Sequence, residues 1–244
     1  MKSTADKVFI RNDWDDIPTG KPELLKPLIT RKCAQRFKAL IPENPTHRKE
    51  ILYPHEATEN GRSAVNLRLY PNSAKYLEQH RHKLESRKYL IEAGRNWYEL
   101  WVPQDPAVWS QSKLVFPDIS EKPIFWLDTS GGVVSGECYW LQCKNKDEQD
   151  LMWLALAVAN SSFIEVFYDH RFNNKLYSGK RRFITQYVEQ FPLPKPDVPT
   201  SIEIIQLTKE IHKKTPSSEA EKLGSILDEL VWKSFGLTSK EMLR

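Results

Sequence analysis

The stretch that most constrains the fold of this chain is an apolar run inside residues 147–168. Its hydrophobic positions are Leu151, Leu154, Leu156, Val158, Phe163, Ile164 and Phe167. The spacing predicts one long helix, and since apolar side chains occur nearly all round it, that helix should be buried against a sheet or other helices. The longest uninterrupted apolar piece, residues 152–159, is too short to span a bilayer. The chain is therefore expected to build a packed interior around this segment.

A basic segment, residues 170–196, follows that helix directly. Between Arg171 and Phe183 it holds five basic side chains and no acidic one: Arg171, Lys175, Lys180, Arg181 and Arg182. Three aromatic residues alternate with them: Phe172, Tyr177 and Phe183. Lys and Arg neutralise phosphate, and aromatic rings stack on bases or wedge between them. The segment predicts a nucleic-acid contact surface, and the alternative is a solvated basic loop flanked by core aromatics.

Composition places the chain among ordinary globular proteins, with 40% hydrophobic and 28% charged residues. The net charge is +4, and basic and acidic residues balance from Ser201 onward, so the excess lies before that residue. The cysteines at 33, 138 and 143 form no CxxC pair, which favours reduced, buried thiols. The first residues contain no apolar signal core, and a cytoplasmic location is expected.

Short elements are predicted outside the long helix. The first seventy residues are rich in proline and charge, which is typical of short strands and turns. We expect strands at residues 7–10, 24–29, 50–53, 113–116, 124–127 and 137–144, and helices at residues 73–88 and 184–190. Asn72 is the expected cap of the first of these helices, and Gly131-Gly132 forms a turn.

The composition changes after Pro199. Helical spacing recurs in residues 202–213 and 219–235, with a break at 213–216. The pattern predicts an α+β fold: a mixed, sheet-containing domain with a buried long helix over residues 1–199, followed by a C-terminal helical hairpin over residues 200–244. We interpret the hairpin as an accessory or docking element.

The sequence contains none of the common catalytic signatures, such as GxGxxG, a Walker-type loop, GxSxG or HExxH. His80 and His82 are two apart on a predicted helix and face different directions, so we expect no shared metal. Pro117-Asp118 and Glu121-Lys122 superficially suggest a nuclease, but the next strand offers neither the carboxylate nor the lysine required. Asp118 and Ser120 are predicted to hydrogen-bond a turn or a base edge, and no catalytic residue is expected.

Eight segments, taken in order, resemble one family. They are ELLKPLITRKCAQRF, YPNSAKYLEQHRHKLESR, NWYELWVPQDP, SKLVFPDIS, KPIFWLD, LALAVANSSFIEVFYDHRF, LYSGKRRFITQYVEQFPLP and SILDELVWKSFGLTSKEM. Together they resemble the TaqI-like C-terminal specificity domain of adenine-specific DNA methyltransferases, including the Type IIG restriction enzymes. The resemblance covers most of the chain from about Val8 onward.

This resemblance implies a target-recognition domain that lies across double-stranded DNA from a Rossmann-like methyltransferase domain. In that family the catalytic domain binds S-adenosylmethionine and flips the adenine. The present chain lacks that half, so we expect no cofactor and no methyl transfer from it alone. It is expected to be a C-terminal fragment of a longer methyltransferase, or else a separate specificity subunit.

The resemblance also points to candidate DNA-binding residues. Tyr177, Ser178, Lys180, Arg181 and Arg182 match the family's loop after the long helix, and Lys175 precedes them in the basic segment. Arg31, Lys32 and Arg36 match a basic segment after ELLKPL. Phosphate contacts would set the register, and a few side chains would read base edges. In this family the reading residues vary with the target, so no recognition sequence is implied.

Two other function classes remain open. A protein–protein scaffold would dock a partner on the hairpin, with Leu227 and Trp232 as the test positions. An RNA-binding module could use the aromatic residues for base stacking, although the sequence has no RNP-type strand or GXXG clamp.

Overall fold

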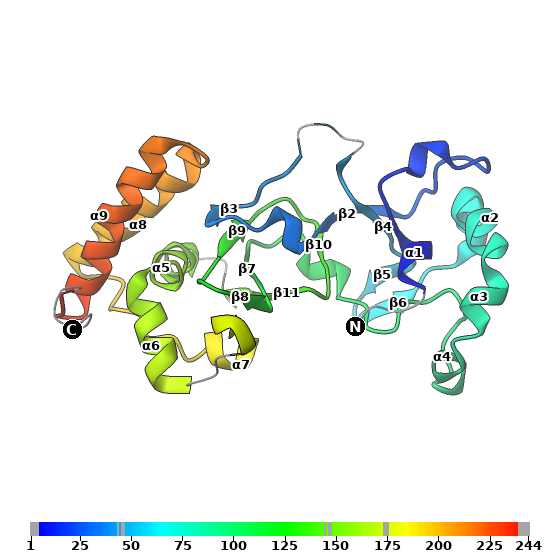
Figure 1. Cartoon of the computed structure of the whole chain (residues 1–244). Coiled ribbons are helices and arrows are strands. Elements are labelled where there is room, and N and C mark those ends of the chain that lie inside the picture. The colour runs from blue at the N-terminus through cyan, green and yellow to red at the C-terminus, as the bar shows by residue number, and fades with distance from the viewer. Residues whose placement is uncertain are drawn as a thin grey trace. The chain divides into compact units, whose positions relative to one another are not determined.

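The structure is a computed structural model that describes residues 5–42, 44, 47–143, 145, 148–172 and 176–238. Its internal contacts divide the chain into two compact units, coloured from the N-terminus to the C-terminus in Figure 1. Unit 1 takes residues up to 29, then 41–111 and 130–133, and unit 2 takes residues 30–40, 112–129 and those from 134 onward. Both units are therefore assembled from segments far apart in the sequence.

Unit 1 combines short strands with short helices. Its α-helices are α1 (Asp6–Phe9), α2 (Pro71–Gln79), α3 (Arg81–Glu85) and α4 (Lys88–Glu92). Its 3-10 turns are η1 (Trp14–Asp16), η4 (Leu67–Leu69) and η5 (Pro106–Val108). Its strands are β1 (Ile10–Arg11), β2 (Leu25–Ile29), β4 (Glu50–Leu52), β5 (His55–Thr58) and β6 (Gly61–Ala64). A sheet has the order β1-β4-β2-β10, with β10 at Val133–Val134, and β5 pairs with β6.

Two expectations for unit 1 are corrected by the structure. Residues 7–10 are mostly the helical turn α1 rather than a strand, because Val8 and Phe9 are both buried. The single helix expected at residues 73–88 is α2 followed by α3, with His80 between them. The N-terminus of α2 is capped from a distance, since Glu23 accepts hydrogen bonds from the backbone N–H groups of Asn72 and Ser73 at 2.9 and 2.8 Å.

Unit 2 is organised around a four-stranded mixed sheet of order β11-β7-β9-β3. The strands are β3 (Phe37–Lys38), β7 (Lys113–Pro117), β9 (Trp126–Asp128) and β11 (Cys138–Leu141). β7 pairs antiparallel with both β9 and β11, and β3 joins β9 in parallel. All five residues of β7 are buried, which identifies it as the central strand. The expected strands near residues 113, 124 and 137 are thus present; Lys144 lies outside the described residues.

Helices cover this sheet and supply most of the core of unit 2. They are α5 (Gln149–Ala159), α6 (Ser162–Phe172), α7 (Thr185–Val188), α8 (Pro199–Lys214) and α9 (Ser218–Ser234). Figure 1 shows α8 and α9 side by side, with α5 next to them. Short pieces complete the unit: η2 (Arg31–Cys33), β8 (Ile119–Ser120), η7 (Tyr177–Gly179) and β12 (Arg181–Arg182). The α+β class and the C-terminal helix pair are confirmed.

The single helix expected over residues 147–168 is instead the pair α5 and α6, bent by 77°. The cause is Asn160, whose side chain pairs with the backbone of Phe125, the residue just before β9. It accepts from Phe125 N at 3.0 Å and donates to Phe125 O at 2.9 Å. Asp228 of α9 then caps the new helix by accepting from Ser162 N at 2.6 Å and from Ser162 Oγ at 2.5 Å.

The C-terminal hairpin packs into the core of unit 2. Its buried side chains include Ile204, Ile211, Leu227, Val231 and Trp232, which join the same apolar cluster as α5 and the sheet. The division of function at residue 199 stays a prediction. Over the described residues no single helix is long and apolar enough to cross a membrane, and α5 with α6 reaches that threshold only as a bent pair.

Candidate nucleic-acid interface

The basic segment forms a short, tightly closed loop at residues 176–182. Leu176 N donates to Lys180 O at 2.7 Å, which brings the two ends together. Ser178 and Gly179 turn the chain with positive φ angles of 68° and 71°, and both are exposed. A serine at positive φ is uncommon and marks a constrained turn. Lys175 and the side chain of Tyr177 lie outside what the structure describes.

Arg181 is the anchor of this loop. Its Nε and Nη2 atoms bind the two carboxylate oxygens of Asp169 on α6, at 2.7 and 2.8 Å. Its Nη1 donates to the carbonyl of Glu121 and lies 3.7 Å from the carboxylate of Glu165. The pKa of Arg181 is raised, chiefly by the hydrogen bond to Asp169. With only 12% of the side chain exposed, the guanidinium ties the loop to α6 and to the turn after β8.

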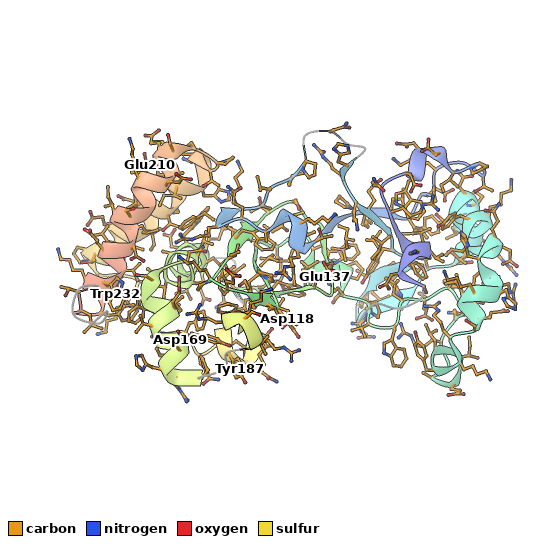
Figure 2. The ribbon with its side chains drawn as sticks, in the orientation of Figure 1. Asp118, Glu137, Asp169, Tyr187, Glu210 and Trp232 are labelled. Carbon is orange, nitrogen blue, oxygen red and sulfur yellow. The ribbon has the colours of Figure 1, made fainter. Side chains whose placement is uncertain are left out.

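Arg182, in contrast to Arg181, is exposed. Its side chain is 50% exposed, and its Nε donates to Asp118 Oδ1 at 3.1 Å. Its backbone is held from two sides: Tyr168 Oη donates to Arg182 O at 2.5 Å, and β12 pairs antiparallel with β8. Figure 2 labels Asp169 and Asp118, the carboxylates that pair with Arg181 and Arg182. The strand thus presents Arg182 outward from a fixed backbone.

Two of the aromatic residues in the segment belong to the core of unit 2. Phe183 is fully buried and its ring lies 4.9 Å from Tyr168. Phe172 stacks on Tyr187 with ring centroids 4.7 Å apart. These two rings fit the alternative given for the segment, in which aromatic residues of the core flank a basic loop. Base stacking by Phe172 or Phe183 would require the core to open.

The second group of candidates, Arg31, Lys32 and Arg36, lies just before β3. Arg31 and Lys32 are exposed on η2, where Thr30 Oγ1 accepts from Lys32 N at 3.2 Å. Arg36 donates to the carbonyl of Asn160, at the bend between α5 and α6, and its guanidinium lies 5.4 Å from the centre of the Phe37 ring. Arg36 therefore braces the bend, whereas Arg31 and Lys32 project from a short capped turn.

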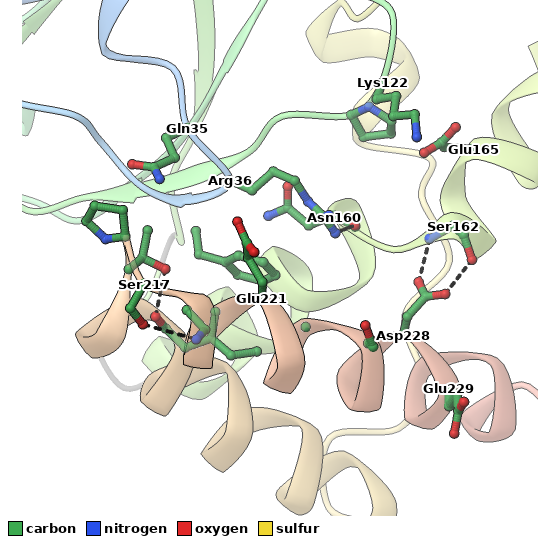
Figure 3. A pocket seen from close by; sticks show the side chains of 18 residues that line it. Gln35, Arg36, Lys122, Asn160, Ser162, Glu165, Ser217, Glu221, Asp228 and Glu229 are labelled. Atoms are coloured by element: carbon green, nitrogen blue, oxygen red, sulfur yellow. Dashed lines mark hydrogen bonds between the residues drawn. The ribbon is translucent and has the colours of Figure 1, made fainter.

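Arg36 also lines an open pocket of about 670 Å³ in unit 2. Figure 3 shows Arg36 beside Asn160, with Glu221 and Asp228 on the helix opposite. The dashed bonds from Ser162 to Asp228 show that this carboxylate already caps a helix. Lys122, Glu165 and Glu229 are the other charged residues labelled around the pocket. No described residue of the 176–182 loop lines the pocket, although Glu165 on its rim lies 3.7 Å from Arg181.

Sequence reasoning missed the acidic partners of the loop. Asp169 and Glu165 lie just before the basic segment, four residues apart, and this i,i+4 spacing on a helix is a signal that one face is acidic. Asp118 was predicted to bond a turn or a base edge, and it holds Arg182. Ser120 bonds a turn as expected, donating to Lys122 O at 2.6 Å. Among the described residues there is no group of three or more metal-ligating side chains.

Comparison with known proteins identifies the family to which the chain belongs. A sequence model of the family described as the TaqI-like C-terminal specificity domain matches residues 29–193. The chain belongs to this family. It is a target-recognition domain of the type found in Type II methyltransferases and restriction–modification enzymes.

Individual relatives are longer proteins. The chain is 39% identical over 241 residues to the Type II methyltransferase M.BanIII of Aneurinibacillus aneurinilyticus, covering 97% of this chain and 41% of that protein. It is 26% identical over 196 residues to M.PaeR7I of Pseudomonas aeruginosa, covering 80% and 32%. The solved structure of the Type IIL restriction–modification enzyme MmeI in complex with DNA has the same fold, with a TM-score of 0.61 and 15% identity over 98% of this chain and 32% of MmeI. The chain thus spans about two fifths or less of each.

Proposed function

We propose that this chain binds double-stranded DNA as the target-recognition part of an adenine-specific methyltransferase of a Type II restriction–modification system. The observation that carries the proposal is the 176–182 loop of unit 2. It is closed on itself, anchored through Arg181, and leaves Ser178 and Arg182 exposed and Lys180 half-buried. A rigid scaffold with an exposed polar and cationic tip is what reading a duplex requires. MmeI, which shares the fold, was solved with DNA.

The catalytic steps would belong to a separate methyltransferase domain, joined in cis or acting in trans. That domain would bind S-adenosylmethionine and transfer the methyl group, in the cytoplasm where the DNA lies. The present chain would supply specificity alone. The relatives' greater length supports this division of labour.

Within this proposal the candidate residues take different parts. Lys180, Arg31 and Lys32 differ from Arg181 and Arg182 in that no carboxylate among the described residues competes with phosphate for them. Arg181 serves through its ion pair, which fixes the loop. Lys175, Tyr177, Ser178 and Arg36 stay candidates for contact with the duplex.

The test is a fluorescence-anisotropy titration of the chain against mixed-sequence duplex DNA at several salt concentrations. We expect the logarithm of the binding constant to fall linearly with the logarithm of salt concentration. Lys180→Ala with Arg182→Ala should weaken binding and flatten that slope. The matched control removes two exposed charges from the hairpin, Lys213→Ala with Lys222→Ala, and should change neither. An equal effect of both pairs, or equal affinity for duplex RNA, would contradict the assignment.

Leu227 and Trp232 cannot test the alternative that the hairpin docks a partner protein. Leu227 and Trp232 are 2% and 1% exposed, so substitutions there would perturb the core of unit 2 rather than a docking surface.

A further inference from the structure

Two adjacent arginines in β12 point to opposite sides. Successive side chains of a strand alternate between its faces, and here Arg181 turns to α6 while Arg182 turns outward. Arg181 uses all three of its nitrogen atoms in bonds to protein. Arg182 uses only Nε, and within the described part of the chain neither of its Nη groups has a partner. The outward arginine therefore keeps the forked end of its guanidinium available.

Asp118 holds that guanidinium from a rigid position. It lies directly between β7 and β8, and its backbone is bonded on both sides. Asp118 N donates to Glu137 O at 3.1 Å, and Phe183 N donates to Asp118 O at 2.7 Å. Its carboxylate is 26% exposed and receives Arg182 Nε at 3.1 Å. Three segments of unit 2 thus fix the orientation of a single exposed fork.

The pairing with Asp118 decides what the fork is suited to bind. Phosphate binding depends on net positive charge, and the carboxylate of Asp118 offsets part of the positive potential of the Arg182 guanidinium, which stays cationic. The Nη donors remain, and a planar fork of donors matches the O6 and N7 acceptors of guanine in the major groove. An oriented fork of donors beside a carboxylate therefore favours base reading, whereas Lys180 has no carboxylate partner among the described residues.

We propose that Arg182 reads a guanine of the target site through its Nη groups and that Asp118 is the positioning residue for this contact. The inference deepens the proposed function and rests on it. It assigns one guanine of the recognition sequence to one side chain, and it separates the reading role of Arg182 from the structural role of Arg181.

The experiment selects duplexes from a randomised pool with the full 244-residue chain. The affinity is then measured for the selected duplex and for duplexes with single base-pair replacements. We expect one guanine position at which replacement weakens binding by about 10- to 100-fold, as for a good bidentate contact. Arg182→Ala should reduce the discrimination at that position to about twofold and leave the other positions unchanged. Arg182→Gln should shift the preference there toward adenine, since Gln pairs with the N6 and N7 atoms of adenine.

Asp118→Asn separates base reading from phosphate binding. If Asp118 positions a reader, the variant loses discrimination at the guanine position. If Arg182 instead binds phosphate, the variant keeps its discrimination at every position while the added positive charge strengthens binding to all duplexes alike. Lys180→Ala is the control, with a uniform loss of affinity and intact discrimination.

Certain results would overturn the inference. They are a uniform loss of affinity in Arg182→Ala with the guanine preference retained, an unchanged guanine preference in Asp118→Asn, or a wild-type site with no preferred guanine. Absence of any duplex binding by the wild-type chain would instead contradict the proposed function, and the inference would fall with it. Circular dichroism of each variant confirms the fold, which Arg182 touches only at the surface.

Discussion

Arg181 and Asp169 form a bidentate ion pair that joins β12 to the helix before the loop, with two N–O distances of 2.7 and 2.8 Å. Their side chains are 12% and 25% exposed, so water screens the pair only in part. The arginine that sequence alone marks as a DNA contact is thereby held inside the protein. Its role as a direct contact stays a prediction, and its structural role has clear consequences.

We expect Arg181→Ala to lower the free energy of unfolding by about 1–3 kcal/mol, because it removes two charge-assisted hydrogen bonds to the partly buried carboxylate of Asp169. Asp169→Asn should cost a similar amount, and the double variant should cost less than the sum. Urea denaturation measures all three. Arg182→Ala, at an exposed pair, is the control and should change stability little. Additive losses would show that the two side chains act separately.

Removal of residues 200–244 should unfold unit 2. The hairpin contributes Ile204, Ile211, Leu227, Val231 and Trp232 to the core, and each such side chain is worth about 2–5 kcal/mol when truncated. Together these losses are as large as the usual stability of a domain, about 5–15 kcal/mol. Near-ultraviolet circular dichroism and limited proteolysis would report the loss of packing. A truncated chain that unfolds cooperatively would instead support the hairpin as a separate accessory element.

Asn160→Asp should destabilise the bend between α5 and α6 despite the equal size of the side chains. The amide Nδ2 donates to Phe125 O at 2.9 Å and to Leu156 O at 3.1 Å, and a carboxylate oxygen there faces two carbonyls. Since Asn160 is 3% exposed, we expect a loss of about 3 kcal/mol or more near neutral pH. Thermal or urea unfolding checks the value. Asn66→Asp, at an exposed turn where an oxygen is the acceptor, should be nearly neutral.

His55 should make the stability of unit 1 depend on pH. Burial lowers its pKa from 6.5 to about 4, and its Nε2 accepts from Leu100 N at 3.1 Å, which requires a neutral ring. The unfolded chain therefore binds an additional proton between these two pKa values. Stability is complete above pH 6.5 and falls as the pH drops toward 4, by up to about 3 kcal/mol from this group.

The measurement compares urea unfolding of the wild type and His55→Gln at pH 7 and pH 5. The substitution should flatten the difference between the two pH values. His82→Gln, at an exposed position, should leave that difference unchanged. Equal pH dependence in the wild type and His55→Gln would show that the histidine is not held neutral.

Local sequence patterns were enough to predict much of the fold. The hairpin helices, the strands near residues 113 and 137, and the buried helical run were predictable because periodicity and burial are encoded in neighbouring residues. The family resemblance and the location of the basic loop also came from contiguous segments. These features need only a window of the chain.

The tertiary structure decided everything that depends on distant partners. The 77° bend follows from the pairing of Asn160 with Phe125 and from the cap by Asp228, groups separated by 35 and 66 residues. The difference between Arg181 and Arg182 is equally invisible in the sequence, where they are adjacent and alike. Only the strand places one beside Asp169 and the other beside Asp118, and the partner of a charge determines whether it holds the fold or remains available for a ligand.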